Sequence, residues 1–223
     1  MDKDLSKEAY IYIKENKQKF LKNYLKGSVV KPKIVVFTAG ASGAGKTEYA
    51  IKRKEIEPYL IHIDTDEIRD FFKPIGYNGA NASLFQKASS KGVDILYKDA
   101  INRGYSVILD TNFSNFNIAN INIQKALKHR YIVKIIYILQ DLNKCYEFAK
   151  AREGVTKRAV PKEVVKKSFV KSFETVLQIK EIYQDRVNLT LIDRINKNTI
   201  EDIANREFFK VVSKELLWVM KIL

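Results

Sequence analysis

The amino-acid sequence predicts an α/β domain in which a parallel β-sheet is flanked by helices. Short, continuous apolar runs, typical of strands buried on both faces, alternate along the chain with longer stretches of helical period. The first run leads directly into a glycine-rich loop and then a helical stretch. Strands that alternate with helices form βαβ units and therefore a parallel sheet. The predicted strands are 34–38, 59–63, 106–109, 131–139 and 187–192.

Helices are expected between these strands and at both ends of the chain. Apolar residues at near-helical spacing in 4–25 predict a lysine-rich amphipathic helix that is ended by Gly27. The other predicted helices are 46–54, 81–103, 115–129, 141–153, 161–184 and 199–221, with Pro161 at a favourable start. Without a repeat or an interdomain linker, we expect one domain that comprises an N-terminal helical arm (1–30), a lid (about 150–162) and a C-terminal strand and helix (186–223).

Composition limits the class of protein. Of 223 residues, 46% are hydrophobic, which suffices for a core and excludes wholesale disorder. The net charge of +14 indicates an anionic partner, such as a nucleotide, a nucleic acid or an acidic protein. The single Cys145, with only His62 and His129, excludes an intramolecular disulfide and a Cys- or His-rich metal centre. We expect a cytoplasmic protein, because no apolar run suits a membrane span and the charged N-terminus is unlike a signal peptide.

Residues 40–47 match the phosphate-binding pattern G-x-x-x-x-G-K-[ST] in full. Glycines allow a tight loop whose backbone N–H groups face one anion at the positive end of the next helix. Lys46 would reach the β- and γ-phosphates of a nucleoside triphosphate, and the Thr47 hydroxyl would bind Mg²⁺. A glycine-rich turn with an exposed lysine is the alternative, but the strand before and the helix after favour nucleotide binding. The nucleotide-binding candidates are Gly40, Ala41, Ser42, Gly43, Ala44, Gly45, Lys46 and Thr47.

Two predicted strands are followed directly by carboxylate side chains. In open α/β sheets, ligands bind at the carboxyl ends of the strands, so these acids should face the site. Asp64 and Asp66 follow one strand, and Asp110 follows another. Phosphoryl transfer needs a group that takes the proton of the acceptor hydroxyl, and Asp64 and Asp66 are alternatives for it. Asp110 could contact the water shell of the metal or the acceptor. Asp64 also fits a helix cap, with Glu67 in a capping-box position.

Other polar residues in this region have two interpretations each. His62 lies within a strand and fits the core better than a catalytic role. Arg69 either contacts the site or forms a surface ion pair. The basic segment 150–171 is typical of a lid that excludes water, and its Arg152 and Arg158 would neutralise the transferring phosphoryl group. Its lysines fit a solvated helix face.

Taken together, these stretches resemble the zeta toxin family of P-loop kinases over about residues 30–185. The resemblance rests on the loop and on Ile63–Asp66, Gly76–Asn81, Phe85–Ala88, Gly104–Asp110 and Arg158–Pro161. It implies a P-loop kinase-type fold and ATP- or GTP-dependent phosphorylation of a UDP-N-acetylated amino sugar, typically the 3′-hydroxyl of UDP-N-acetylglucosamine. It also implies an antitoxin that restrains the enzyme, here a small acidic protein.

The resemblance assigns a role to individual residues. It implies that Asp66 is the base and that Asp110 binds the acceptor, and it agrees with the roles given to Lys46, Thr47 and the two lid arginines. The candidate acceptor-binding residues are Asp66, Arg69, Asp110 and Asn112. The chain departs from the family at Ser42 and Ala44, where many members have Pro and Ser. An arginine that helps to hold the sugar nucleotide in the best-known members is replaced near 112–115.

Two other functions stay open. One is a polynucleotide 5′-hydroxyl kinase or another small-molecule or nucleotide kinase. The positive charge favours a nucleic acid, but the sequence lacks the interleaved aromatic and basic residues that stack unpaired bases. The other is a binding protein whose nucleotide only sets its conformation, which would not need a D-x-D acid aimed at an acceptor.

Overall fold

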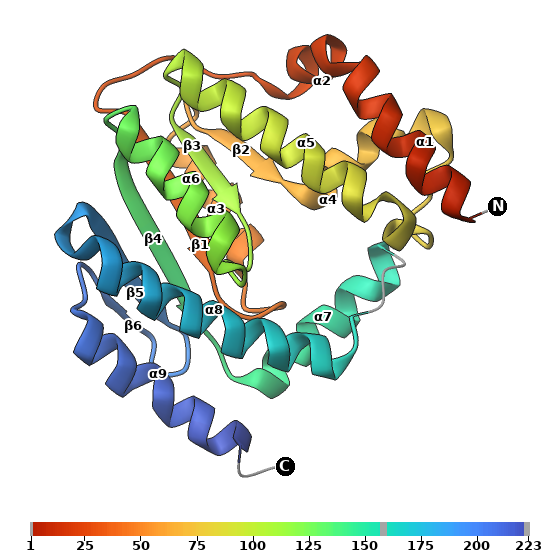
Figure 1. The fold of residues 1–223 in the computed structure, drawn as a ribbon. Coiled ribbons are helices and arrows are strands. Elements are labelled where there is room, and N and C mark those ends of the chain that lie inside the picture. The colour runs from red at the N-terminus through yellow and green to blue at the C-terminus, as the bar shows by residue number, and fades with distance from the viewer. Residues whose placement is uncertain (1, 157–159, 221–223) are drawn as a thin grey trace.

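A six-stranded sheet lies at the centre of this computed structural model, which describes residues 2–156 and 160–220 (Figure 1). The strand order is β2-β3-β1-β4-β5-β6, and all strands are parallel except β6, which pairs antiparallel with β5. The strands are β1 (Ile34–Ala39), β2 (Ile61–Asp64), β3 (Val107–Asp110), β4 (Ile132–Leu139), β5 (Val187–Asp193) and β6 (Asn198–Ile200). The predicted α/β class with a mainly parallel sheet is confirmed.

The register of the central strands brings the carboxyl ends of β1, β2 and β3 together. β1 lies between β3 and β4, so the loop that follows Ala39 leaves the sheet at the middle of its carboxyl edge. β2 and β3 pair so that Asp64 stands directly beside Asp110. Both carboxylates therefore lie next to the start of the phosphate-binding loop.

Helices cover both faces of the sheet, with α5, α6 and α8 in front of it in Figure 1 and α3 behind it. α8 begins directly after Pro161, as predicted, because proline fixes a backbone angle suited to a helix start. The ring of Phe173 on α8 lies 5.6 Å from that of Phe208, which docks α9 against α8. These helices are α3 (Lys46–Ile56), α5 (Ala82–Arg103), α6 (Phe116–Lys128), α7 (Leu142–Thr156), α8 (Lys162–Tyr183) and α9 (Asn205–Met220).

The N-terminal arm is a pair of helices, so the prediction of one helix ended by Gly27 was wrong. α1 (Asp2–Glu15) and α2 (Lys17–Tyr24) meet at Asn16, whose side-chain amide donates to the carbonyl of Tyr12 at 3.0 Å. The break lets both helices reach one aromatic side chain. The ring of Phe71 lies 5.5 Å from Tyr12 on α1 and 5.2 Å from Phe20 on α2. The pair packs along α5 (Figure 1).

The C-terminal prediction was also partly wrong, because the helix expected over 199–221 begins only at Asn205. The carboxylate of Asp193 accepts hydrogen bonds from the backbone N–H groups of Ile195 and Asn196, each at 3.0 Å. This turn sends the chain back along β5, where residues 198–200 pair as β6. The unforeseen strand is thus a consequence of a side-chain-capped turn.

Two further segments differ from expectation. The chain forms the short helix α4 (Thr65–Arg69), which only the cap interpretation of Asp64 implied, and the helix η1 (Asp70–Ile75), which was not predicted. α7 continues to Thr156 through Gly154, which was expected in a loop; a Cβ there would meet nothing, and an exposed glycine costs a helix only about 1 kcal/mol. Part of the predicted lid, residues 157–159, lies outside the described residues. Within the described ranges, no helix is both long and apolar enough to cross a membrane.

The packing of α2 makes a stability prediction. Phe20 on α2 is fully buried against α5 and Phe71. Phe20→Ala should therefore lower the free energy of unfolding by about 3–4 kcal/mol, measured by urea denaturation. The matched control is Phe209→Ala on α9, where the ring is 52% exposed, and its cost should stay below about 1.5 kcal/mol. Equal losses in the two variants would contradict a structural role of the arm.

Candidate active site

The phosphate-binding loop connects β1 to α3, as its pattern predicted. Gly43 has φ +83°, and a Cβ at this position would lie 2.0 Å from the carbonyl oxygen of Cys145, so the loop passes too close to α7 for a side chain. Gly45 precedes the first turn of α3. N–H groups in a first turn have no partner inside their own helix, and the helix dipole adds positive charge there. The loop can therefore receive an anion.

Lys46 is the buried cation of this loop, with 7% of its surface exposed. Its ammonium group donates to the carbonyl of Ala41 at 2.5 Å. Burial lowers the pKa of Lys46 to about 8, although the nearby Asp110 carboxylate opposes the shift. Phosphate oxygens at the loop would act like the Asp110 carboxylate and favour the charged form of Lys46. Nucleotide binding and protonation of Lys46 therefore support each other.

Thr47 and Asp110 place two hard oxygen donors side by side. The Thr47 hydroxyl donates to one carboxylate oxygen of Asp110 at 2.7 Å, and the Thr38 hydroxyl donates to the other at 2.9 Å. Hydroxyl and carboxylate oxygens are the ligands that Mg²⁺ prefers, together with water and phosphate. This donor set fits the predicted Mg²⁺ site at Thr47.

Asp64 caps the next helix, which was one of its two interpretations. Its side chain accepts from the backbone N–H of Asp66 at 2.9 Å. Burial raises the pKa of Asp64 to about 6, and the neighbouring Asp110 carboxylate adds to the shift. The expected capping box is replaced, because the Glu67 carboxylate lies 3.4 Å from Nδ1 of His62. Burial opposes the charged form of His62, but the contact with Glu67 and the surrounding carboxylates raise its pKa overall.

Asp66 is surrounded by guanidinium groups. Arg69 forms an ion pair with it, and Nη2 of Arg152 lies 3.5 Å from its other oxygen. Arg69 is only 1% exposed and also donates to Oε1 of Gln86 at 2.5 Å, so it contacts the site and does not form a surface ion pair. Arg158, the second predicted lid arginine, lies outside the described residues.

One cavity of about 270 Å³ is lined by Lys46, Thr47, Asp64, Asp66, Arg69, Asp110 and Arg152. Asn112 joins them, and its amide donates to the Ser42 hydroxyl at 3.2 Å. A second hollow of about 540 Å³ continues from Asp110 and Gln86 between α5 and α6. The structure thus gathers these predicted site residues around the first cavity: Ser42, Gly43, Lys46, Thr47, Asp66, Arg69, Asp110, Asn112 and Arg152.

Two contacts to the loop were missed from the sequence. The Ser168 hydroxyl on α8 accepts from the backbone N–H of Ser42 at 2.9 Å, and nothing in the sequence marks this serine. Arg194 donates from Nη2 to the carbonyl of Gly45 at 3.2 Å. Arg194 directly follows the carboxyl end of β5, so the rule that singled out the strand-end acids could have found it.

Comparison with known proteins gives a family match and a shared fold. The family model for zeta toxin matches residues 20–206. A structure from the PezAT chromosomal toxin–antitoxin system of Streptococcus pneumoniae is 17% identical, with a TM-score of 0.69 over 91% of this chain and 95% of that chain. The AvrRxo1-ORF1:-ORF2 complex with ATP is 14% identical, with a TM-score of 0.65 over 94% of this chain and 69% of that chain. No curated protein sequence matches significantly.

The paired carboxylates predict a pH-dependent stability. The pKa of Asp64 is about 6 in the folded chain and 3.8 when unperturbed, so its contribution to stability is complete below pH 3.8 and is lost as the pH rises through 6. Asp64→Asn keeps the cap but removes the charge. Without Mg²⁺ or nucleotide, this variant should be more stable than the natural chain by roughly 1–2 kcal/mol at pH 7.5 and equally stable near pH 4.

Urea denaturation at the two pH values measures this difference. Asp70→Asn is the matched control, because Asp70 lies on the exposed surface, where it pairs with Lys73, and it should change stability little at either pH. A stability gain for Asp64→Asn that is the same at both pH values would show that burial and the Asp110 charge do not act on Asp64.

Proposed function

The chain belongs to the zeta toxin family, and from this premise we propose that it is a kinase for a nucleotide sugar. It would transfer the γ-phosphate of ATP or GTP to a hydroxyl of a UDP-N-acetylated amino sugar such as UDP-N-acetylglucosamine. The observation that carries the proposal is one cavity shared by a phosphate-binding loop and an acid held by two guanidinium groups, namely Lys46 with Thr47 and Asp66 with its arginines.

On the donor side, the N–H groups at the start of α3 and the ammonium group of Lys46 would hold the triphosphate. Thr47, with Asp110 behind it, would hold Mg²⁺. When bound, this ion would neutralise charge on the phosphate oxygens.

In the transfer step, the acceptor oxygen forms a bond to the γ-phosphorus while the bond from that phosphorus to the β–γ bridging oxygen breaks, and ADP or GDP leaves. Asp66 accepts the proton of the acceptor hydroxyl. Its ion pairs with Arg69 and Arg152 fix the direction of the carboxylate. Arg152, with Arg158, would neutralise charge on the transferring group.

The second hollow supports a large acceptor. Its walls are mixed, with polar side chains such as Gln86, Asp110 and Ser114, the cationic Lys98, and apolar side chains of α5 and α6 such as Ile118. A sugar nucleotide combines a hydroxyl-bearing ring, a diphosphate and a flat base, and walls of mixed polarity suit such a molecule. Asn112 and Ser114 stand where the expected arginine is replaced.

We further propose a small acidic antitoxin as the protein partner. The support is the family match, the similarity to a structure from a toxin–antitoxin system and the net charge of +14, which would attract an acidic surface.

The role of Asp66 can be tested by removing only its charge. Asp66→Asn should bind ATP with a Kd within about threefold of the natural chain, because the loop is intact, and should lose about 10²–10⁴-fold in transfer rate. Calorimetry measures the first quantity and transfer of labelled phosphate the second. Asp70→Asn, four residues away on the exposed surface, is the matched control and should keep both. Undiminished transfer by Asp66→Asn would mean that another group takes the proton.

The acceptor can be identified with a panel of hydroxyl compounds. Labelled ATP or GTP is incubated with the protein and, in separate reactions, UDP-N-acetylglucosamine, small nucleotides and metabolites, and 5′-hydroxyl oligonucleotides. We expect label on the UDP-sugar and its loss in Asp66→Asn. Label on the oligonucleotide alone would replace this proposal by a polynucleotide kinase, and binding of nucleotide without transfer to any acceptor would favour a nucleotide-controlled binding protein.

A further inference from the structure

We propose that Gln86 is a positioning residue for phosphate transfer: it holds the buried guanidinium group of Arg69, which in turn directs the carboxylate of Asp66. Gln86 acts in this way through Arg69 and needs no contact with the substrate. The inference rests on the proposed role of Asp66 as the base, but it does not depend on which acceptor is used.

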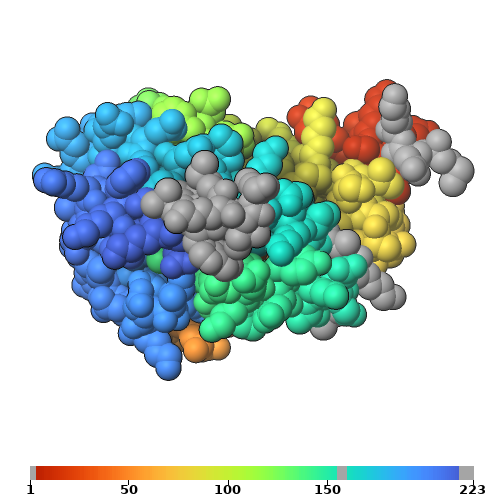
Figure 2. All heavy atoms as spheres, turned by 90° about the horizontal axis from the view of Figure 1, so that it is seen from below, coloured from red at the N-terminus to blue at the C-terminus, as the bar shows by residue number. Residues whose placement is uncertain are grey.

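The two arginines that contact Asp66 differ in how firmly they are held. The side chain of Arg69 on α4 is only 1% exposed, whereas that of Arg152 on α7 is 45% exposed. Figure 1 and Figure 2 show the turquoise end of α7 beside the yellow segment that leads into α5, so α7 reaches the acid from the outer side. An arginine with nearly half of its side chain in solvent can turn towards a phosphate group. Arg69 is then the group that keeps the acid in place.

The guanidinium group of Arg69 depends on few acceptors. A guanidinium group carries five N–H donors, and burial removes the water that would otherwise accept from them. Within the described residues, Nη1 forms the ion pair with Asp66, and Nη2 donates to Oε1 of Gln86 at 2.5 Å. The buried Nε finds no acceptor in this part of the chain. The amide of Gln86 is therefore the second of two points that fix the guanidinium plane, and without it the group can turn about its contact with Asp66.

The amide of Gln86 is itself oriented. An arginine side chain can only donate, so Oε1 of Gln86 must face Arg69, and Nε2 must face away from it. There Nε2 donates to the Ser90 hydroxyl at 3.3 Å, one turn farther along α5. Gln86 and Ser90 both line the 540 Å³ hollow. A chain of contacts thus runs from the wall of this hollow through Gln86 and Arg69 to the proposed base.

This chain of contacts should matter for the rate of transfer more than for binding. Transfer depends on how accurately the reacting groups are held, and a displacement of about 1 Å can cost about 10²-fold. Loss of Gln86 would leave Asp66 and Arg69 in the site and would only loosen their direction. We therefore expect a smaller effect, of about tenfold, and we expect it in kcat because this contact holds neither substrate.

The test compares two substitutions of Gln86. Gln86→Leu removes the acceptor of Arg69, whereas Gln86→Glu keeps a side-chain oxygen for it. In transfer of labelled phosphate to the acceptor that the panel identifies, Gln86→Leu should lower kcat about tenfold and change both KM values less than about threefold. Gln86→Glu should stay within about threefold of the natural chain, as should the matched control Gln124→Leu, at an exposed glutamine on α6. A higher KM for the acceptor with unchanged kcat would show that Gln86 binds substrate, and would overturn the proposal.

A variant of the base shows whether Gln86 acts through it. In the Asp66→Asn background, the guanidinium group of Arg69 no longer directs a base, so adding Gln86→Leu should lower the residual transfer less than about twofold. The natural background should still show the full loss of about tenfold. Equal losses in the two backgrounds would mean that Gln86 acts independently of Asp66, which would overturn the proposal.

A measurement without transfer tests the contact itself. In isotope-labelled protein, a guanidinium group held at both Nη atoms rotates slowly and gives separate NMR signals for them, which Arg69→Lys would assign to Arg69. The signals should merge in Gln86→Leu and stay separate in Gln86→Glu and Gln124→Leu. Unchanged signals in Gln86→Leu would overturn the proposal whatever the acceptor is. If the signals merge but the natural chain phosphorylates no compound, the proposed function and the role of Gln86 in transfer both fail, while its contact with Arg69 stands.

Discussion

The hydrogen-bonded unit of Thr38, Asp110 and Thr47 is the interaction on which the site depends. It joins the end of β1, the end of β3 and the first turn of α3 through two hydroxyl groups that donate to one carboxylate. The parallel register of β1 with β3 makes this contact available, because it brings Thr38 level with Asp110 at the carboxyl edge. The loop between β1 and α3 is therefore tied at both of its ends to the neighbouring strand, and its backbone is preorganised for an anion.

The charged groups near this unit lie where their charged forms are disfavoured, and a bound ligand would reduce that penalty. Burial lowers the pKa of Lys46, and burial together with Asp110 raises the pKa of Asp64, so cation and anion are each held where their charged forms are disfavoured. A triphosphate would compensate the first and a divalent cation the second. These buried charged groups lower the stability of the ligand-free chain, and the same groups would bind a charged ligand strongly. Such an arrangement is common at sites of phosphoryl transfer.

The strands and the loop could be predicted because their physical cause is local. Continuous apolar runs and the spacing of glycines in 40–47 depend on neighbouring residues only, and the strand-end positions of Asp64 and Asp110 follow directly. The break at Asn16 and the turn at Asp193 instead depend on side chains that bond to the backbone and on partners distant in sequence, such as Phe71. Ser168 is the extreme case, since only the packing of α8 brings its hydroxyl to the loop.

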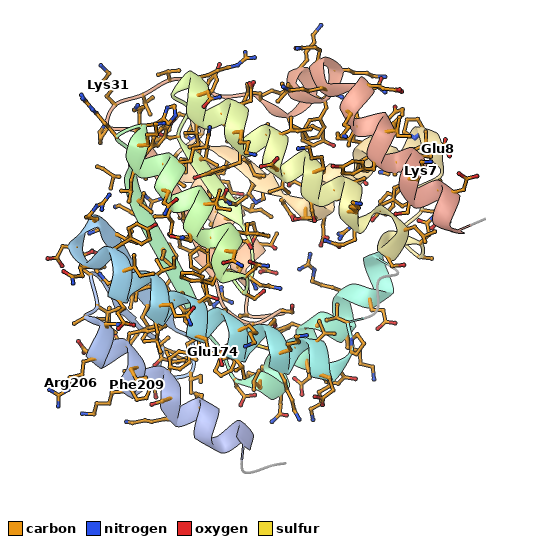
Figure 3. All side chains as sticks on the ribbon, in the orientation of Figure 1. Lys7, Glu8, Lys31, Glu174, Arg206 and Phe209 are labelled. Atoms are coloured by element: carbon orange, nitrogen blue, oxygen red, sulfur yellow. The ribbon has the colours of Figure 1, made fainter. Side chains whose placement is uncertain are left out.

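Most of the positive charge contributes less to recognition than a few fixed cations. Lys46, Arg69 and Arg194 are each held by a hydrogen bond to a neighbouring residue of the site. Donors fixed in this way lose little conformational freedom when a ligand binds. Lysines on the surface, such as Lys7 on α1 and Lys31 before β1 in Figure 3, are far from this cavity and act only through a field that salt screens within about 8–10 Å. The net charge can therefore speed the approach of any anion, whereas on the proposed function the choice among anions depends on groups fixed in the cavity, Asp66 with Arg69 and Arg152.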